Sequence, residues 1–194
     1  MKKKLLPLMI GMLFFSLCAS CAPDEGEDRA AAIRDYFAGM DACSATVLLT
    51  ADFGDRAQDF TLKLRYEKNR DTTVEILAPA EVAGVTARID GTDSQLFFED
   101  VVLETGPLPG GGLTPVDALP TMLRVWADGY LLESGEEKLS GVKVYHLTWR
   151  NMVGETEIIH HGWFDRESFH PLRAEVLSDG TLIISCDFEL FEAA

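Results

Sequence analysis

The chain has 194 residues, of which 47% are hydrophobic, and it carries 17 basic against 32 acidic side chains for a formal charge of -15. This length suits one domain, and the composition excludes a disordered chain, a collagen and a polytopic membrane protein. Nucleic acid is not an expected partner, because binding phosphates depends on Lys and Arg side chains that neutralise them.

Residues 1–20 have the pattern of a secretory signal peptide. Three lysines, at positions 2–4, precede an apolar run from Leu5 to Leu17, and small residues follow that run. The run is shorter than the ~20 apolar residues that a membrane-spanning helix needs, so export is favoured over a transmembrane anchor. Cleavage after residue 20 removes three lysines and no acids, which leaves a formal charge of -18.

The residues Cys18-Ala19-Ser20-Cys21 resemble a bacterial lipobox, in which the last cysteine receives a diacylglyceryl group and becomes the mature N-terminus. Cys21 is therefore the expected lipidation site. Ordinary signal cleavage nearby is the alternative, since Leu is commonest where Cys18 stands. Two or more acyl chains hold a protein firmly on a bilayer, at ~0.8 kcal/mol per buried methylene. We expect anchoring to the outer face of the cytoplasmic membrane, or to the outer membrane if the host has one, with residues 21–28 as a lipidated N-terminus and polar tether.

Two cysteines, Cys43 and Cys186, remain after export and acylation. An oxidising compartment permits a disulfide between them, and closing so long a loop contributes up to about 5 kcal/mol in the chain-entropy model. Two buried free thiols are the alternative. The sequence leaves both open, because it does not place the two Cα atoms.

The first half of the chain predicts one helix followed by a series of strands. Ile33, Phe37 and Met40 recur at helical spacing and predict an amphipathic helix from about Asp28 to Asp41. Alternating apolar residues then predict strands at 45–53 and 60–66, around 74–76, and at 85–89, 96–98 and 101–103. Pro79 cannot donate to a sheet ladder, so residues 80–83 are expected to be a connection.

A second helix is predicted after a Gly- and Pro-rich stretch. Thr114 suits the cap, Pro115 the first helical position and Asp117 the positive end of the helix, and Asp128-Gly129 ends it. Alternation then returns at 142–149, 155–163, 172–177 and 182–190, which makes about 10–11 strands in all. Residues 29–194 therefore predict one mainly β (α+β) domain, a curved, unclosed antiparallel β-barrel whose concave face is covered by the two helices.

A curved sheet of this kind has an apolar inner side that is either a groove or a filled core. The candidate groove residues occupy inward strand positions or the facing stripe of the second helix: Phe60, Leu62, Leu64, Tyr66, Val74, Ile76, Met122 and Trp126. A groove of this composition suits a lipid tail.

Enzyme motifs are absent from the sequence. It contains no Gly-x-Ser-x-Gly elbow, no phosphate-binding loop ending in Lys, and no His-Glu-x-x-His zinc helix. His160 and His161 are adjacent on a predicted strand, so their side chains leave from opposite faces and cannot readily share one metal ion. We expect no catalytic residue, no metal and no cofactor.

The segment from Val74 to Val85, the residues Leu113 to Pro115 and the turn at Trp163 to Asp165 together resemble the LolA-type lipoprotein carrier superfamily. They are similar in particular to its anchored envelope lipoproteins of spore-forming bacteria, which include the germination lipoprotein GerS group. The similarity runs over nearly the whole mature chain and consists of packing and turn signatures. It implies a LolA/LolB-like unclosed β-barrel around a helical plug, which holds acyl chains in the carriers and grips a partner protein in the germination type.

These features predict a non-enzymatic, membrane-anchored extracytoplasmic lipoprotein that acts as a binding or scaffold module in the cell envelope. The resemblance adds sporulation or germination as its setting. One alternative is a carrier or chaperone that binds lipid or lipoprotein acyl chains on the concave face. Another is an accessory factor that stabilises a cell-wall hydrolase. The expected partners are the membrane, through the N-terminal lipid, and acyl chains or a cell-envelope protein.

Overall fold

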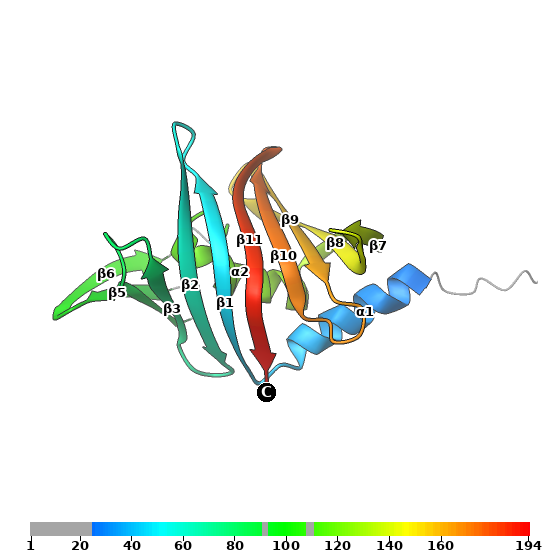
Figure 1. Ribbon diagram of the computed structural model, residues 1–194, viewed down its shortest axis with the longest axis horizontal. Helices are drawn as coiled ribbons and strands as arrows, with labels where there is room; N and C mark the ends of the chain where they lie inside the picture. Colours follow the sequence, from blue (N-terminus) through cyan, green and yellow to red (C-terminus); the bar gives the residue numbers. More distant parts are fainter. Residues whose placement is uncertain (1–24, 91–92, 108–110) are drawn as a thin grey trace, which may run out of the picture.

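The computed structural model describes residues 25–90, 93–107 and 111–194. Within these ranges the chain forms two helices and one sheet of eleven strands (Figure 1). The predicted signal peptide (1–20) and the predicted lipidation site Cys21 lie outside the described residues, so both stay predictions. Among the described residues, no helix is both long enough and apolar enough to span a membrane.

The elements follow one another in two groups. The first group is α1 (Glu25–Ala38), β1 (Ala42–Asp52), β2 (Ala57–Glu67), β3 (Thr72–Ala78), β4 (Thr86–Asp90), β5 (Asp93–Phe98) and β6 (Val101–Pro107). The second group is α2 (Pro115–Asp128), β7 (Tyr130–Leu139), β8 (Val142–Val153), β9 (Thr156–Phe164), β10 (Pro171–Ser178) and β11 (Thr181–Ala193).

The sheet has the order β6-β5-β4-β3-β2-β1-β11-β10-β9-β8-β7, and each described pairing is antiparallel. Strands that follow one another in the chain are therefore neighbours in the sheet, except for β6 and β7, and the first and last strands, β1 and β11, pair at the centre. The two edges are β6 and β7, and α2 is the element that joins them along the chain. It lies behind the sheet in Figure 1, where the curved strands partly enclose it.

One face of the sheet is apolar and turned toward the helices. Along β1 every second residue is buried, from Cys43 to Ala51, while the residues between them are more exposed. The register continues this face into β2, because Ala45 lies opposite Leu64 and Val47 lies opposite Leu62. Period-two burial of this kind is what one buried and one solvated sheet face produce.

Both helices contribute to the hydrophobic core on this concave face. Ile33 and Phe37 of α1 and Trp126 of α2 are buried. The Trp126 ring centroid lies 5.0 Å from that of Phe37 and 5.1 Å from that of Phe164 on β9. These aromatic contacts connect the two helices to the sheet, so the prediction of a curved, unclosed antiparallel barrel covered by two helices is confirmed.

The observed elements differ from the predicted ones in two places. The first helix begins at Glu25 and ends at Ala38, about three residues earlier than its periodicity predicts. The strand β7 was not predicted. It is an edge strand whose residues are mostly exposed on both faces, including the acidic run around Glu136, and exposure on both faces removes the alternation that marks a strand.

Candidate functional site

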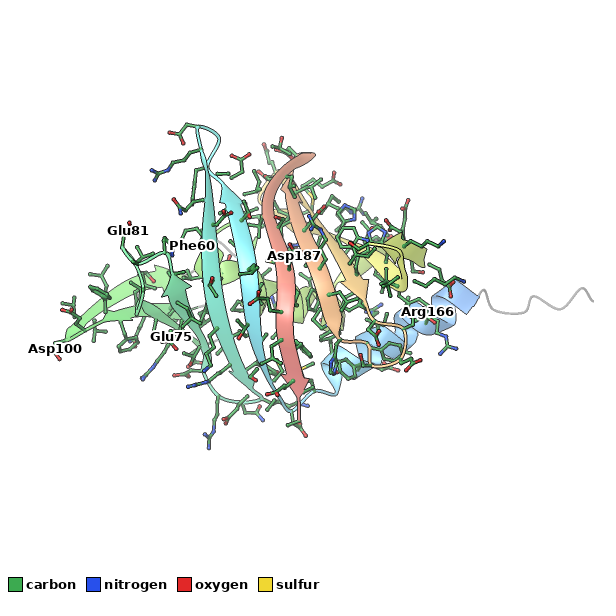
Figure 2. The ribbon with its side chains drawn as sticks, in the orientation of Figure 1. Phe60, Glu75, Glu81, Asp100, Arg166 and Asp187 are labelled. Atoms are coloured by element: carbon green, nitrogen blue, oxygen red, sulfur yellow. The ribbon has the colours of Figure 1, made fainter. Side chains whose placement is uncertain are left out.

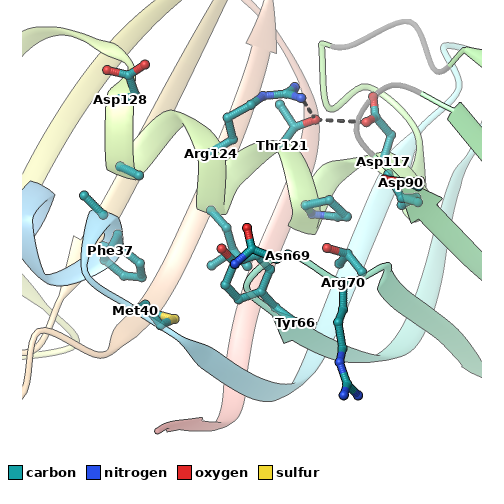
Figure 3. Close-up of a pocket in the computed structure, with 16 residues that line it drawn as sticks. Phe37, Met40, Tyr66, Asn69, Arg70, Asp90, Asp117, Thr121, Arg124 and Asp128 are labelled. Carbon is teal, nitrogen blue, oxygen red and sulfur yellow. Dashed lines mark hydrogen bonds between the residues drawn. The ribbon is translucent and has the colours of Figure 1, made fainter.

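A cavity of about 520 Å³ opens between the two helices and one half of the sheet. Its walls come from the end of α1 and the turn after it, from one side of α2, and from the segments that join β2 to β3 and end β4 (Figure 3). The cavity exists because α2 lies across the concave face and leaves the ends of these strands uncovered.

The inner wall of the cavity is apolar. Phe37 and Met40 come from the C-terminal end of α1 and the turn that follows, Leu123 from α2 and Ile89 from β4, and all four are buried. Tyr66, near the end of β2, is half-buried and packs against the same core. An apolar guest would therefore contact side chains that already belong to the hydrophobic core.

The rim of the cavity is polar and of mixed charge. Arg70, Asp90, Arg124 and Asp128 are exposed at its edge. Arg70 forms an ion pair of 3.0 Å with Glu67 outside the cavity. Two cations and two anions around one opening favour a polar or zwitterionic group at the mouth over a ligand of strong net charge.

A buried hydrogen-bond network fixes the α2 side of the rim. The Asp117 carboxylate accepts hydrogen bonds of 2.9 Å from the backbone N–H of Gly112 and of 2.9 Å from the Thr121 hydroxyl. The Arg124 guanidinium donates to the same Thr121 oxygen at 3.3 Å (Figure 3). The helix begins as predicted, since the Thr114 hydroxyl accepts from the backbone N–H of Asp117 at 3.3 Å. Asp117 thus joins the loop before α2 to its first turns.

The cavity is suited to binding. Ligand sites in proteins are mostly clefts of ~300–1,000 Å³ with an apolar lining and a few placed polar groups, and this one has that size and composition.

The residues predicted to line a groove lie mostly in the filled core. Phe60 and Tyr66 are partly buried against the core cluster. The other six are buried within it: Leu62, Leu64, Val74, Ile76, Met122 and Trp126. Of the whole predicted set, Tyr66 alone is among the described residues that line the cavity. The hollow part of the interior is displaced from the middle of the sheet toward the ends of β2 and β4.

Cys43 and Cys186 are both buried and free. Cys43 pairs with Ala193, and Cys186 pairs with Leu49, so the two cysteines are separated by six residues along β1. At 3.3–3.4 Å per residue this is about 20 Å, far beyond the reach of a disulfide. The structure therefore has two buried free thiols rather than a disulfide. Burial raises the pKa of the Cys43 thiol to about 12 and also raises the pKa of the Cys186 thiol.

The histidines of β9 point to opposite faces, as their adjacency predicts. His160 is fully buried on the concave face, and both its ring nitrogens lack a hydrogen-bond partner among the described residues. Burial first, and then the Arg124 and His161 charges, lower the pKa of His160 to about 4. His161 is half-buried on the convex face, where His146 of β8 lies beside it.

The pair formed by His146 and His161 was missed by the sequence analysis, because the two residues are 15 positions apart in the chain. The antiparallel pairing of β8 with β9 brings them together on one face. A signal was available, since both occupy the same alternation phase on two consecutive predicted strands. Burial lowers the pKa of His146, the Glu137 charge opposes that shift, and the His161 charge adds to it.

Exposed large apolar residues are spread over much of the sheet, and one continuous group of them lies at the β6 edge. The β5–β6 hairpin extends beyond the part of the sheet that α2 covers (Figure 1), and Asp100 marks its tip (Figure 2). Val101, Val102 and Leu103 follow the tip, and each is more than half exposed. Three consecutive exposed apolar residues on an edge strand are unusual for a surface that stays in water.

No family model matches the chain, and no curated protein matches it in sequence. Solved structures do match. A LolA superfamily protein from Nitrosomonas europaea is 14% identical over 87% of this chain and 93% of its own, with a TM-score of 0.51. An uncharacterized conserved protein from Thermus thermophilus is 14% identical over 87% of each chain, with a TM-score of 0.52. A chain in the complex of the CwlD amidase with the GerS lipoprotein from Clostridioides difficile is 16% identical over 86% of this chain and 94% of its own, with a TM-score of 0.42. The two matches with TM-scores above 0.5 show that the chain has a LolA-like fold.

Proposed function

We propose that the chain is a lipoprotein of the cell envelope that binds the apolar part of a ligand, such as an acyl chain, in the cavity between its helices and β2–β4. It does so without catalysing a reaction. The observation that carries this proposal is the cavity itself, with a buried apolar wall and a polar rim. An acyl chain would replace water against the wall, gaining ~25 cal/mol for each Å² of apolar surface removed from water, while its polar head stays at the rim.

A cavity-filling substitution tests this use. Ala127 lines the cavity from α2, whereas Ala31 lies exposed on α1 and is not among the residues that line it. We expect Ala127→Trp to abolish binding of a fluorescent fatty acid to the detergent-purified chain, and Ala31→Trp to leave it unchanged. Native mass spectrometry of the unsubstituted chain should also detect a co-purified acyl compound. If the chain binds no fatty acid, or if Ala127→Trp binds it as well as the parent does, the proposal is wrong.

The N-terminal residues support an envelope location. Export and acylation at Cys21 would hold the domain on the outer face of the cytoplasmic membrane, or on the outer membrane where the host has one. Intact-mass analysis of membrane-derived protein should find residue 21 acylated, and Cys21→Ser should release the chain into the soluble fraction. A chain that stays on the membrane after this substitution would exclude acylation as its anchor.

A second use, binding a protein partner of the envelope, is favoured by the exposed apolar hairpin. One partner of this kind is a cell-wall hydrolase, which the chain would stabilise during sporulation or germination. A photo-crosslinking residue at Val102 should give discrete adducts in cells. The same residue at Val142 should not, although Val142 is equally exposed in the β7–β8 hairpin. Identical adducts from both positions would count against a docking role for the β5–β6 hairpin.

A further inference from the structure

A compact group of polar and aromatic side chains lies on the convex face, on the side of the sheet away from the cavity. We call it the outer cluster, and it consists of Glu137 (β7), His146 and Thr148 (β8), and His161 and Trp163 (β9). Thr148 and Trp163 are buried, and the His146 side chain is only 25% exposed. These side chains are more buried than is usual on the face of a sheet that is turned to solvent.

The Glu137 carboxylate fixes the tautomer and the orientation of His146. Its Oε2 atom lies 2.9 Å from His146 Nδ1 and accepts a hydrogen bond of 3.2 Å from the Trp163 indole N–H. Because an ionised carboxylate only accepts, Nδ1 of His146 carries the hydrogen and donates it. The imidazole also stacks on Trp163, at 4.5 Å between centroids and 6° between planes. In the neutral ring, the lone pair of His146 is therefore on Nε2.

That lone pair faces a second imidazole. His146 Nε2 lies 3.0 Å from His161 Nδ1, and the Thr148 hydroxyl oxygen lies 3.1 Å from the same Nδ1 atom. With His146 Nδ1 donating to Glu137, a hydrogen on His161 Nδ1 would bridge the two nitrogens. If His161 moves its hydrogen to Nε2, both facing nitrogens present lone pairs, and a cation between them can use both.

The separation of the two nitrogens lets both reach one metal ion after a turn of the rings. The ring centroids lie 5.2 Å apart, so in the structure the two nitrogens point nearly straight at each other, and the rings must turn to direct both lone pairs at one ion. For metal–nitrogen bonds of ~2.0–2.1 Å, two nitrogens 3.0 Å apart subtend about 94° at the metal. Square-planar and tetragonal coordination requires about 90°, whereas tetrahedral coordination would require the nitrogens to separate to about 3.3 Å. Imidazole ligands in tetragonal geometry are typical of Cu²⁺ and Ni²⁺.

The charges around the outer cluster favour a cation. Glu133 lies opposite Thr148 in the register, and Glu175 lies opposite His161, so carboxylates flank the pair from both neighbouring strands. Arg173 is the nearby cation on β10, and its guanidinium is already held by Glu175 at 2.9 Å and by Asp187 at 3.1 Å. The chain as a whole is strongly acidic, which raises the local concentration of cations.

We propose that His146 Nε2 and His161 Nδ1 form a surface site for a late first-row divalent cation, Cu²⁺ or Ni²⁺, with Glu137 as the residue that orients His146. Metal-binding histidines commonly donate their other ring N–H to a carboxylate, and Glu137 has this position. Solvent completes the coordination, because no set of three or more His, Cys, Asp or Glu side chains within the described ranges is placed to hold a metal ion. This departs from the expectation of no metal, because the distance in sequence between His146 and His161 gave no indication that the strand register brings them together.

The test uses the untagged full-length chain purified in detergent, titrated with Cu²⁺ and Ni²⁺ by calorimetry. We expect saturable binding of one ion per chain. We also expect the EPR spectrum of bound Cu²⁺ to carry hyperfine splitting from two imidazole nitrogens. His146→Ala and His161→Ala should each weaken binding at least tenfold. Glu137→Gln should weaken it about tenfold, since residues that orient a ligand contribute 10–100-fold to metal affinity. His170→Ala is the matched control, because it removes a histidine that lies outside the outer cluster and should leave binding unchanged.

Circular dichroism checks that each variant is folded. If either alanine variant fails to fold, the remaining variant and the EPR spectrum of the unsubstituted chain decide the question. The proposal is overturned if the chain binds neither ion saturably, if both folded histidine variants bind like the parent, or if the Cu²⁺ spectrum lacks imidazole nitrogen splitting. Unchanged affinity in Glu137→Gln would refute the orienting role of that carboxylate.

Discussion

Acidification should destabilise the fold through His160. This ring is fully buried beneath α2, and neither of its nitrogens has a hydrogen-bond partner among the described residues. Burial is the main reason that its pKa falls, and the charges of Arg124 on α2 and of His161 on the same strand lower it further. The folded state therefore keeps His160 neutral at a pH at which the unfolded chain already binds a proton.

The size of the effect follows from the two pKa values. The pKa of His160 falls from 6.5 to about 4 on folding, and each tenfold change in an equilibrium constant corresponds to ~1.4 kcal/mol, which gives about 3 kcal/mol. The unfolded state binds more protons between these two values, so the free energy of unfolding rises with pH across that window. The contribution is fully present above about pH 6.5 and is lost as the pH falls toward 4. A loss of this size is a large part of the stability of a typical domain.

Urea unfolding at a series of pH values from about 7 to about 4 measures this contribution. Carboxylates also titrate in the lower part of the range, so the informative quantity is the difference between the parent and His160→Met, which cannot titrate. Between pH 7 and 4 the free energy of unfolding of the parent should fall by about 3 kcal/mol more than that of His160→Met. A difference that stays flat from pH 7 to 4 would refute the reasoning.

Three further predictions concern the interior. Trp126→Ala should lower the free energy of unfolding by ~3–5 kcal/mol, measured by urea denaturation, because it leaves a cavity among the aromatic rings between α1, α2 and β9; a loss below 1 kcal/mol would mean that the helices are not held there. Cys43 and Cys186 should resist iodoacetamide in the native chain and react fully after unfolding, as counted by mass spectrometry, since burial raises the pKa of both thiols; rapid native labelling would contradict their burial. Asp117→Ala should cost ~1–3 kcal/mol by leaving a buried backbone N–H and a buried hydroxyl without their acceptor, and a variant as stable as the parent would show that these groups find other partners.

The sequence predicts most of this fold because its signals are local. Alternation along β1 and the cap, proline and acid at the start of α2 each act within a few residues, and the structure has both elements where these signals place them. The edge strand β7 carries no such signal. Its side chains face solvent on both sides, so hydrogen bonds to β8 rather than a pattern of burial define it as a strand.

The two sites could not be predicted in the same way, because each depends on which segments α2 and the strand register bring together. The cavity joins Phe37, Tyr66, Ile89 and Leu123, which belong to four different elements, and its place depends on how far α2 extends over the concave face. The middle of that face is filled by the residues whose alternation is strongest, since inward positions near the centre of the sheet are covered from both helices. Hollow space remains where the strands end and α2 no longer covers the concave face. A pattern search that selects the most regular apolar stripe therefore finds the core and passes over the adjoining cavity, whose lining mixes apolar residues with turn residues and rim charges.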